Sequence, residues 1–232
     1  MTPYYDADGI TIYHGDCADV LPLVDPDTVD LLLTDPPYGI NLNTDYDGRG
    51  RGLASPNSTH VARTKRKAKA NTFPPVAGDD EPFDPSPLLE FRRVVLWGAN
   101  NYARHLPDSP SWIVWNRQSG GSATADAELA FTNLGGTVRM FTYLWNGCAR
   151  AGEKETHGLH PTQKPTALMR WIVDRWTEPG DLVLDPYMGS GPVAQACRDL
   201  GRRYIGCELV EEYCKVAVDR LAQGVLDFGG VA

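Results

Sequence analysis

The sequence predicts an α/β fold built on a doubly wound, mostly parallel sheet, and two observations support this prediction. Short apolar runs of strand length alternate with longer segments whose apolar residues recur at helical spacing. Parallel strands need such crossover segments, which then cover both faces of the sheet. The 232 residues suit a single domain spanning 1–232, because no internal repeat and no second core pattern interrupts them.

The first two thirds of the chain contain most of the predicted strands and one long irregular segment. A short helix or turn is expected at 17–24 and a helix at 87–93. Strands are expected at 9–16, 28–35, 94–98, 111–117, 127–133 and 138–147. Residues 41–87 lose periodicity and fill with Gly, Asn, Asp, Pro and basic residues, which predicts an irregular loop insertion. A loop this long in a compact domain is usually functional or disordered.

The last third shows the clearest alternation. Pro165 suits the first turn of a helix at 166–176, and "EPGD" ends that helix. A buried strand at 182–185 leads through the glycine loop "PYMGSG" into a helix closed by Gly201. A strand at 203–208 and a helix at 211–223 follow. This order is typical of a parallel sheet with helical crossovers.

Composition excludes several classes of protein. No apolar run approaches the roughly 18 residues that span a bilayer, and "MTPYYDADGI" lacks the basic and then apolar layout of a signal peptide. The five cysteines are odd in number and form no C-x-x-C pair, which argues against a disulfide framework and against a zinc site. We therefore expect a reduced, cytoplasmic setting and no bound metal.

Charge is distributed unevenly along this chain, whose net charge is −8. Between positions 49 and 70 there is no acid, and the basic residues there are Arg49, Arg51, Arg63, Lys65, Arg66, Lys67 and Lys69. Such a run can be a solvated loop, or it can contact the phosphates of a nucleic acid. Charge alone does not choose between these interpretations.

The glycine loop carries the features of a nucleoside site. Asp185 ends one predicted strand, Gly189 and Gly191 precede the next helix, and Glu208 ends the following strand. An acid about 20 residues after such a loop is placed to meet ribose hydroxyls. The acid before the loop would repel a phosphate but suits a cationic ligand, and S-adenosylmethionine has a sulfonium, an ammonium and a ribose. The alternative is a tight turn with a surface acid.

The stretch "TDPPYG" (34–39) follows an apolar strand and carries the chemistry for methylating an exocyclic amine. Asp35 can accept one N–H of the amine, and the carbonyl of Pro36 can accept the other, with Pro37 keeping the backbone rigid. Both acceptors help most when the nitrogen becomes positive during transfer. Tyr38 can stack on a base flipped out of a duplex. No metal or covalent intermediate is needed.

Three motifs in order resemble those of the amino-group DNA methyltransferases. "TDPPYG" resembles their catalytic motif, "LDPYMGSG" their cofactor motif, and "LHPTQKP" (159–165) the segment that precedes it in the beta class. The catalytic motif comes first, which is the circularly permuted order of that class. The resemblance covers 10–40 and 157–220, and it implies a Rossmann-like, S-adenosylmethionine-dependent methyltransferase fold.

The resemblance also implies roles for single residues in cofactor binding. Asp16 is expected at the adenine, Glu208 at the ribose hydroxyls and Asp185 at the methionine end. Thr162 and Lys164 are expected at the methionine carboxylate. The further lining residues are expected to be Cys17, His160, Tyr187, Gly189, Ser190 and Gly191. His160 can instead be a residue at the start of the helix that hydrogen-bonds to the backbone.

The resemblance implies double-stranded DNA as partner, with target recognition by the basic segment and by 117–160. Arg117, Gln118 and Arg150 are candidates for DNA contacts, since Arg and Gln suit purine edges. Trp115 is a candidate base-stacking residue, although tryptophans are more often core. The Asp in the first motif position favours adenine N6, and cytosine N4 is the alternative. The short variable region is compatible with a homodimer or a permissive enzyme.

Two further alternatives use the same residues differently. The chain could be a catalytically idle module of this fold that binds nucleic acid, although the retained acids and Tyr38 argue against this. The substrate could also be RNA or a protein glutamine, where the related motif usually starts with Asn and follows the glycine loop. Asp35 and the reversed motif order argue against that substrate.

Overall fold

The structure, a computed structural model, describes residues 1–42, 44–46, 71–73, 75–120, 125–146, 149–152 and 162–223. Within these ranges the strands are β1 (Tyr5–Ala7), β2 (Ile10–His14), β3 (Leu31–Thr34), β4 (Asp45–Tyr46), β5 (Asn71–Thr72), β6 (Val94–Trp97), β7 (Trp112–Asn116), β8 (Ala127–Thr132), β9 (Arg139–Thr142), β10 (Trp145–Asn146), β11 (Ala149–Arg150), β12 (Leu182–Asp185) and β13 (Arg203–Glu208). The helices are α1 (Cys17–Val20), α2 (Thr166–Trp176), α3 (Pro192–Asp199) and α4 (Glu211–Ala222). No helix in the described ranges is long and apolar enough to cross a membrane.

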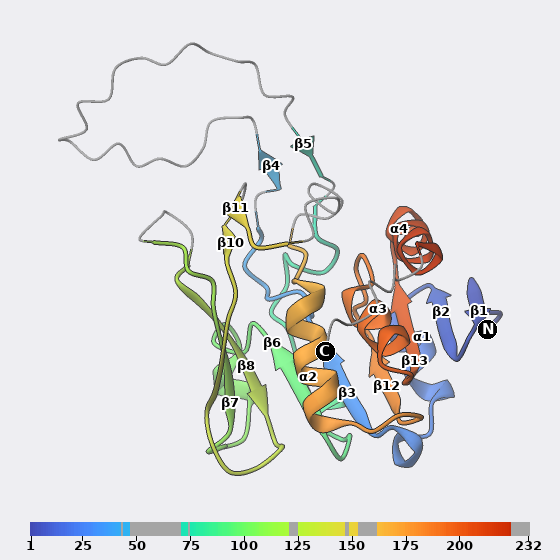
Figure 1. The fold of residues 1–232 in the computed structure, drawn as a ribbon, viewed down its shortest axis with the longest axis horizontal. Coiled ribbons are helices and arrows are strands. Elements are labelled where there is room, and N and C mark those ends of the chain that lie inside the picture. The colour runs from blue at the N-terminus through green and yellow to red at the C-terminus, as the bar shows by residue number, and fades with distance from the viewer. Residues whose placement is uncertain are drawn as a thin grey trace, which may run out of the picture.

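One sheet of nine strands organises the molecule, in the order β1-β2-β13-β12-β3-β6-β8-β7-β9. Strands β2, β13, β12, β3 and β6 are mutually parallel neighbours, and β8 runs antiparallel to both β6 and β7. The short pairs β4–β5 and β10–β11 form separate ribbons, and Figure 1 shows β4 and β5 standing apart from the sheet. The predicted α/β fold with a mostly parallel sheet is confirmed.

The two faces of the sheet are covered differently. Because side chains alternate along a strand, Leu31 and Leu33 of β3 point to one face and Leu32 to the other. Helices α2, α3 and α4 pack on the first face, where Ile172 joins Leu31 and Leu33 in one buried cluster (Figure 1). On the second face Leu32 packs with Phe91 and other residues from turns rather than from long helices. Both faces are therefore buried, as a parallel sheet requires.

The helix predicted at 87–93 is wrong. The structure has a single 3₁₀ turn at Ser86–Leu88, followed by turns and bends up to β6. Leu88 and Phe91 are 2% and 5% exposed, so the apolar spacing that predicted a helix is satisfied by two anchors on the sheet. The backbone then returns at once to the sheet, where Leu32 donates its amide hydrogen to the carbonyl of Arg93 at 2.9 Å. Tertiary packing has replaced the helix here.

The packing of α3 on α4 depends on a residue without a side chain, Gly191. Its φ of 74° lies in the left-handed region, and a Cβ at this position would stand 2.7 Å from the Cβ of Ala217 in α4. Gly201, which closes α3, has a similar φ of 70° but has nothing within 4 Å of such a Cβ. The two glycines thus share a backbone constraint and differ in the space around them.

We expect Gly191→Ala to destabilise the protein more than its matched control Gly201→Ala. The control should lose about 1–2 kcal/mol, because alanine is strained at positive φ. Gly191→Ala should lose about 1–3 kcal/mol more, because α4 must move away from the new methyl group. Urea unfolding of both variants measures this difference. Equal losses would show that the α3–α4 contact places no limit on position 191.

Candidate functional site

The acids expected to form the site gather at one edge of the sheet. Asp35 and Asp185 stand at the carboxyl ends of the adjacent strands β3 and β12, and Glu208 ends β13, the next neighbour. Asp16 follows β2, whose last residue pairs with Glu208. Ligands of parallel α/β sheets bind outside the carboxyl ends of the strands. The structure therefore brings these four predicted residues to one edge, although the chain separates them widely.

Asp35 is held by two side chains, one of them from far along the sequence. Lys164 donates from Nζ to Oδ2 of Asp35 at 2.5 Å, and the hydroxyl of Tyr38 donates to Oδ1 at 2.5 Å. Lys164 also donates to the Tyr38 hydroxyl at 3.0 Å and forms an ion pair with Oε2 of Glu128 at 3.1 Å. The Lys164 side chain is 4% exposed, whereas Asp35 keeps 22%. Asp35 therefore stays accessible to a ligand, whereas Lys164 does not.

Burial and charge oppose one another in this cluster. Burial raises the pKa of Asp35 the most, and the charge of Lys164 lowers it. The charge of Glu128 raises this pKa, and the hydrogen bond from Tyr38 lowers it. Burial lowers the pKa of Lys164, but Asp35 and Glu128 raise it, and the net direction is upward. The pKa of Tyr38 is raised well above its usual range, chiefly by burial and then by Asp35. Lys164 therefore stays cationic and Tyr38 stays a proton donor.

The loop after Asp35 is fixed by an acid that the sequence did not single out. Asp79 is 4% exposed and accepts the amide hydrogens of Tyr38 and Gly39 at Oδ1, at 2.8 and 2.9 Å, and that of Leu42 at Oδ2, at 2.7 Å. Asp79 falls within the segment 41–87 that was expected to be an irregular insertion. Part of that segment therefore supports the site. No local pattern marks Asp79, because its partners lie about 40 residues away in sequence.

The ring of Tyr38 rests on Gly98, directly after β6. A Cβ on Gly98 would stand 1.9 Å from the ring, and φ is 70° at this residue. The Tyr38 position therefore requires glycine at 98, for space as well as for backbone conformation.

The glycine loop is tied to the strand ends beneath it. Glu208 accepts the amide hydrogens of Gly189 and Val210, both at 2.9 Å, one on each carboxylate oxygen. The buried Ser190 hydroxyl donates to the side-chain oxygen of Gln163 at 3.3 Å. Gln163 lies within "HPTQKP" but was not named among the expected residues. It connects that motif to the glycine loop.

Asp185 is buried, and each of its carboxylate oxygens accepts a hydrogen bond from a protein group. The Thr34 hydroxyl donates to Oδ1 at 2.6 Å and the Tyr204 hydroxyl to Oδ2 at 3.3 Å, and Asp185 is 2% exposed. Burial raises its pKa to about 7, with Thr34 and Tyr204 acting in the opposite direction. Asp185 thus joins β12 to β3 and β13.

Among the remaining predicted cofactor residues, Asp16 and Cys17 lie at the start of α1, directly after the strand β2 that pairs with β13. Asp16 is exposed and caps α1 by accepting the amide hydrogen of Ala18 at 2.8 Å. A side-chain hydrogen bond joins Cys17 and Tyr187, which brings the start of α1 to the glycine loop. Thr162 is half-buried next to Gln163. His160 lies outside the described residues.

The residues expected to contact DNA have mixed outcomes. Arg117 donates to Glu128 at 2.9 Å and lies over the Trp115 ring at 5.3 Å, and Arg150 lies 3.9 Å over the Trp145 ring. Trp115 is 1% exposed and donates to a backbone carbonyl, so it is a core residue and the base-stacking alternative is wrong. The candidates Arg49, Arg51, Arg63, Lys65, Arg66, Lys67 and Lys69 lie outside the described residues.

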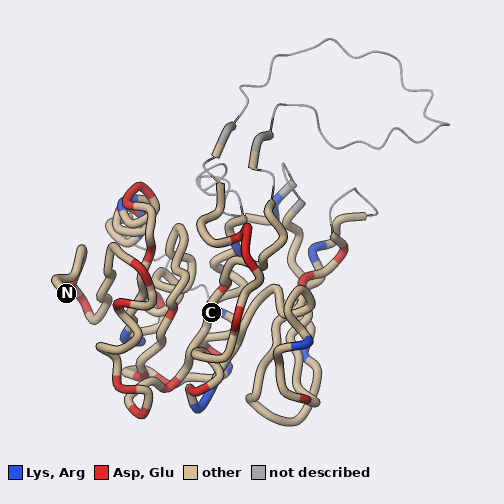
Figure 2. The backbone as a smooth tube through the Cα atoms, turned by 180° about the vertical axis from the view of Figure 1, so that it is seen from behind, with Lys and Arg blue, Asp and Glu red and all other residues tan. Residues whose placement is uncertain are grey.

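Charge over the rest of the described residues does not mark a second site. Figure 2 shows Asp and Glu spread over the described tube, with Lys and Arg scattered among them. Within the described ranges, no group of three or more His, Cys, Asp or Glu side chains could hold a metal ion.

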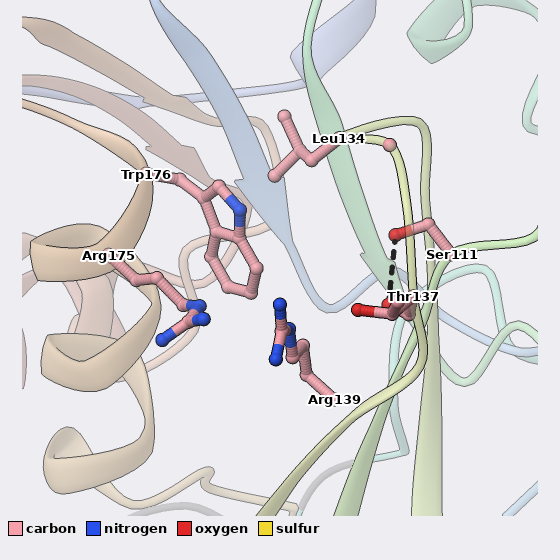
Figure 3. Close-up of a pocket in the computed structure, with 7 residues that line it drawn as sticks. Ser111, Leu134, Thr137, Arg139, Arg175 and Trp176 are labelled. Carbon is pink, nitrogen blue, oxygen red and sulfur yellow. Dashed lines mark hydrogen bonds between the residues drawn. The ribbon is translucent and has the colours of Figure 1, made fainter.

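A cavity of about 440 Å³ lies away from this edge. Figure 3 shows Arg175 and Trp176 on one side of it and Arg139, Thr137 and Ser111 on the other. Helix α2 begins two residues after Lys164 and ends at Trp176, so the cavity lies at its far end. The cavity therefore lies apart from the cluster around Asp35.

Comparison with known proteins gives one family and several relatives. A family described as "DNA methylase" matches residues 115–219. The chain is 26% identical over 247 residues to Type II methyltransferase M2.DpnII of Streptococcus pneumoniae, covering 94% of this chain and 92% of that protein. It is also 26% identical over 249 residues to Type II methyltransferase M2.MboI of Moraxella bovis, covering 95% and 91%. These matches run over nearly the whole length of each relative.

Two solved structures share the fold. The PvuII DNA methyltransferase (cytosine-N4-specific) superposes with a TM-score of 0.60 at 14% identity, covering 99% of this chain and 90% of that one. The M1.HpyAVI–SAM complex superposes with a TM-score of 0.51 at 22% identity, covering 91% and 98%. At these identities the likeness establishes the architecture described above.

The raised pKa of Asp185 predicts a particular pH dependence of stability. A buried acid whose pKa is raised binds its proton more tightly in the folded state, so its ionisation disfavours folding as the pH rises. Relative to Asp185→Asn, the wild type should therefore lose stability between about pH 4 and pH 8, by up to about 4 kcal/mol. Urea unfolding of both proteins across this range measures the difference. A constant difference would show that Asp185 is ionised in both states throughout.

Proposed function

The chain belongs to the amino-group (N6-adenine and N4-cytosine) DNA methyltransferase family and is an S-adenosylmethionine-dependent enzyme, and we propose that it methylates the N6 amine of an adenine flipped out of double-stranded DNA. The observation that carries this proposal is the accessibility of the Asp35 carboxylate together with its contact to Lys164. This residue is a reachable carboxylate at the carboxyl edge, held in place by a buried cation. Such an acceptor suits an amine that must become positive during reaction.

The residues at the edge fit S-adenosylmethionine by the chemistry of their donors and acceptors. Glu208 uses each carboxylate oxygen once, for Gly189 and Val210, which leaves lone pairs for ribose hydroxyls. Asp16 is exposed beside it and is proposed to meet the adenine. The direct contact of Asp185 with the methionine end stays a prediction, since protein groups already meet both of its oxygens. When bound, the cofactor supplies an electrophilic methyl group.

The residues of this chain act on the amine in three ways. Asp35 accepts one N–H, and the carbonyl of Pro36 accepts the other, so the nitrogen lone pair is directed away from both acceptors. As the nitrogen becomes positive, both hydrogen bonds strengthen, which lowers the barrier rather than tightening the ground state. Tyr38 stacks on the flipped base. This requires the Tyr38 hydroxyl to leave Oδ1 of Asp35, which it contacts in the free protein.

Adenine is favoured over cytosine by the Asp in the first position of the motif. Cytosine N4 is the second candidate, because its amine needs the same two acceptors. The relatives' names, Type II methyltransferases, support methyl transfer without choosing the base. The basic segment 49–69 is proposed to contact DNA phosphates. A homodimer and a cytoplasmic setting stay predictions.

Incubation with labelled S-adenosylmethionine and unmethylated DNA, followed by nucleoside analysis, tests the proposal. We expect N6-methyladenine, and we expect Asp35→Ala to lower the rate by two or more orders of magnitude, at least roughly 2.7 kcal/mol. Asp199→Ala is the control, because it removes a carboxylate from an ion pair with Arg170, outside the site.

The outcomes separate the alternatives. N4-methylcytosine alone would replace the adenine proposal by the second candidate. Cofactor binding without label in DNA would indicate an idle module, or another substrate if label appears in RNA or protein. Near-normal turnover by Asp35→Ala would show that this residue is not the amine acceptor.

Lys164→Met should shift the acidic limb of the pH–rate profile to higher pH. Lys164 is the cation that lowers the pKa of Asp35, and without it burial and Glu128 are left to raise that pKa. The working carboxylate then forms only at higher pH, so kcat falls first on the acidic side. Profiles of kcat for both proteins measure the shift. An unmoved limb with a raised KM for S-adenosylmethionine would instead support the expected contact with the methionine carboxylate.

A further inference from the structure

Glu128 occupies the centre of a chain of charged side chains that crosses from the β7–β8 hairpin to Asp35. It lies in β8 directly opposite Trp115 of β7, and its side chain is 23% exposed. Oε1 accepts from Arg117 at 2.9 Å, and Oε2 lies 3.1 Å from Nζ of Lys164. Each oxygen thus has a different cation. The expected site residues did not include Glu128, although a charged residue on a half-buried strand is itself unusual.

Lys164 depends on Glu128 for one of its three hydrogen-bonding partners. An ammonium has three donors, and here they are taken by Asp35, Tyr38 and Glu128. The lysine stem is flexible, and its head group is almost fully buried. Of the three partners, Asp35 and Tyr38 are the two that must engage the target base in the proposed reaction. Glu128 is then the partner that stays in contact with Lys164 while the others exchange contacts.

The position of Glu128 is in turn set by Arg117. The Nε of Arg117 donates to the carbonyl of Trp145 at 3.2 Å, and its guanidinium lies over the buried ring of Trp115. Two contacts of different kinds therefore fix the Arg117 side chain, and its hydrogen bond with Oε1 then fixes one oxygen of Glu128. The other oxygen faces Lys164. The arrangement gives Lys164 an anchor that belongs to the rigid sheet rather than to the loop of Asp35.

We propose that Glu128 is a positioning residue for methyl transfer, which holds the Lys164 ammonium against Oδ2 of Asp35 so that Oδ1 remains directed at the target amine. This inference rests on the proposed role of Asp35. Glu128 does not touch the substrate or the cofactor. It supports the reaction through Lys164, whereas its direct effect on Asp35 is the charge repulsion that raises the pKa of that residue. Its loss therefore slows the chemical step and leaves cofactor binding unchanged, and the loss does not slow the reaction where Lys164 is already absent.

A double-mutant cycle tests this dependence. Glu128→Gln keeps the length of the side chain and removes its charge. We expect single-turnover methylation to fall about tenfold or more, with the Kd for S-adenosylmethionine changed less than about twofold. In a Lys164→Met background the same change should lower the rate less than about twofold, because the residue through which Glu128 acts has gone. Asp199→Asn is the control for loss of a buried carboxylate from an ion pair.

The results separate a positioning role from a structural one. Equal losses in the two backgrounds, or a rate within about twofold of wild type for Glu128→Gln, would overturn the inference. Glu128→Asp, which keeps the charge on a shorter stem, should recover part of the rate if the contact with Lys164 is what matters. Asp35→Ala in the same assay tests the underlying function separately. If that variant is slow while the cycle is additive, only the role of Glu128 fails.

Discussion

The pair formed by the Lys164 ammonium and the Asp35 carboxylate is the contact on which the rest of the site depends. The two residues are 129 positions apart, and each comes from a different block of motifs. A buried cation without a partner would be costly, so Lys164 favours the arrangement in which the loop after β3 and the segment before α2 meet. Asp79 and Gly98, from two further segments, hold Tyr38 and its loop in place, and Gln163, next to Lys164, contacts the glycine loop. The loop after β3 and the glycine loop are consequently parts of one interaction network.

The same edge shows how a parallel sheet accommodates several acids at close range. Asp185 is surrounded by hydroxyl groups, Glu208 by backbone amides and Asp35 by a cation, so each carboxylate has a different kind of partner. Burial raises the pKa of all three, but their partners differ in charge. Asp185 is thus the acid whose two oxygens both meet side-chain hydroxyls and which is almost fully buried. The environment of each acid, rather than its type, thus distinguishes its role.

Much of the architecture was predictable because it depends on local patterns. The strand 182–185, the glycine loop and the helix that follows all have short-range signals, and the structure has them where they were expected. The helix expected at 87–93 failed because Leu88 and Phe91 satisfy their burial on the sheet without helical hydrogen bonds. Glu128 and Asp79 were missed for a related reason. Their partners are distant in sequence, so only the folded chain reveals what they contact.

The hydrogen bond from Tyr38 to Asp35 affects the free energy with which a target base binds at Asp35 in the proposed reaction. In the free protein the hydroxyl occupies the same oxygen that an amine N–H would occupy in the proposed reaction. In the proposed reaction one donor to Oδ1 is exchanged for another, while Oδ2 keeps its contact with Lys164. In the free protein, the Tyr38 hydroxyl thus takes the position at Oδ1 that the amine of the substrate would take in the proposed reaction. In the proposed reaction a target base must displace the Tyr38 hydroxyl from Oδ1 of Asp35. A base whose amine cannot donate to this oxygen would gain no stabilisation from Asp35.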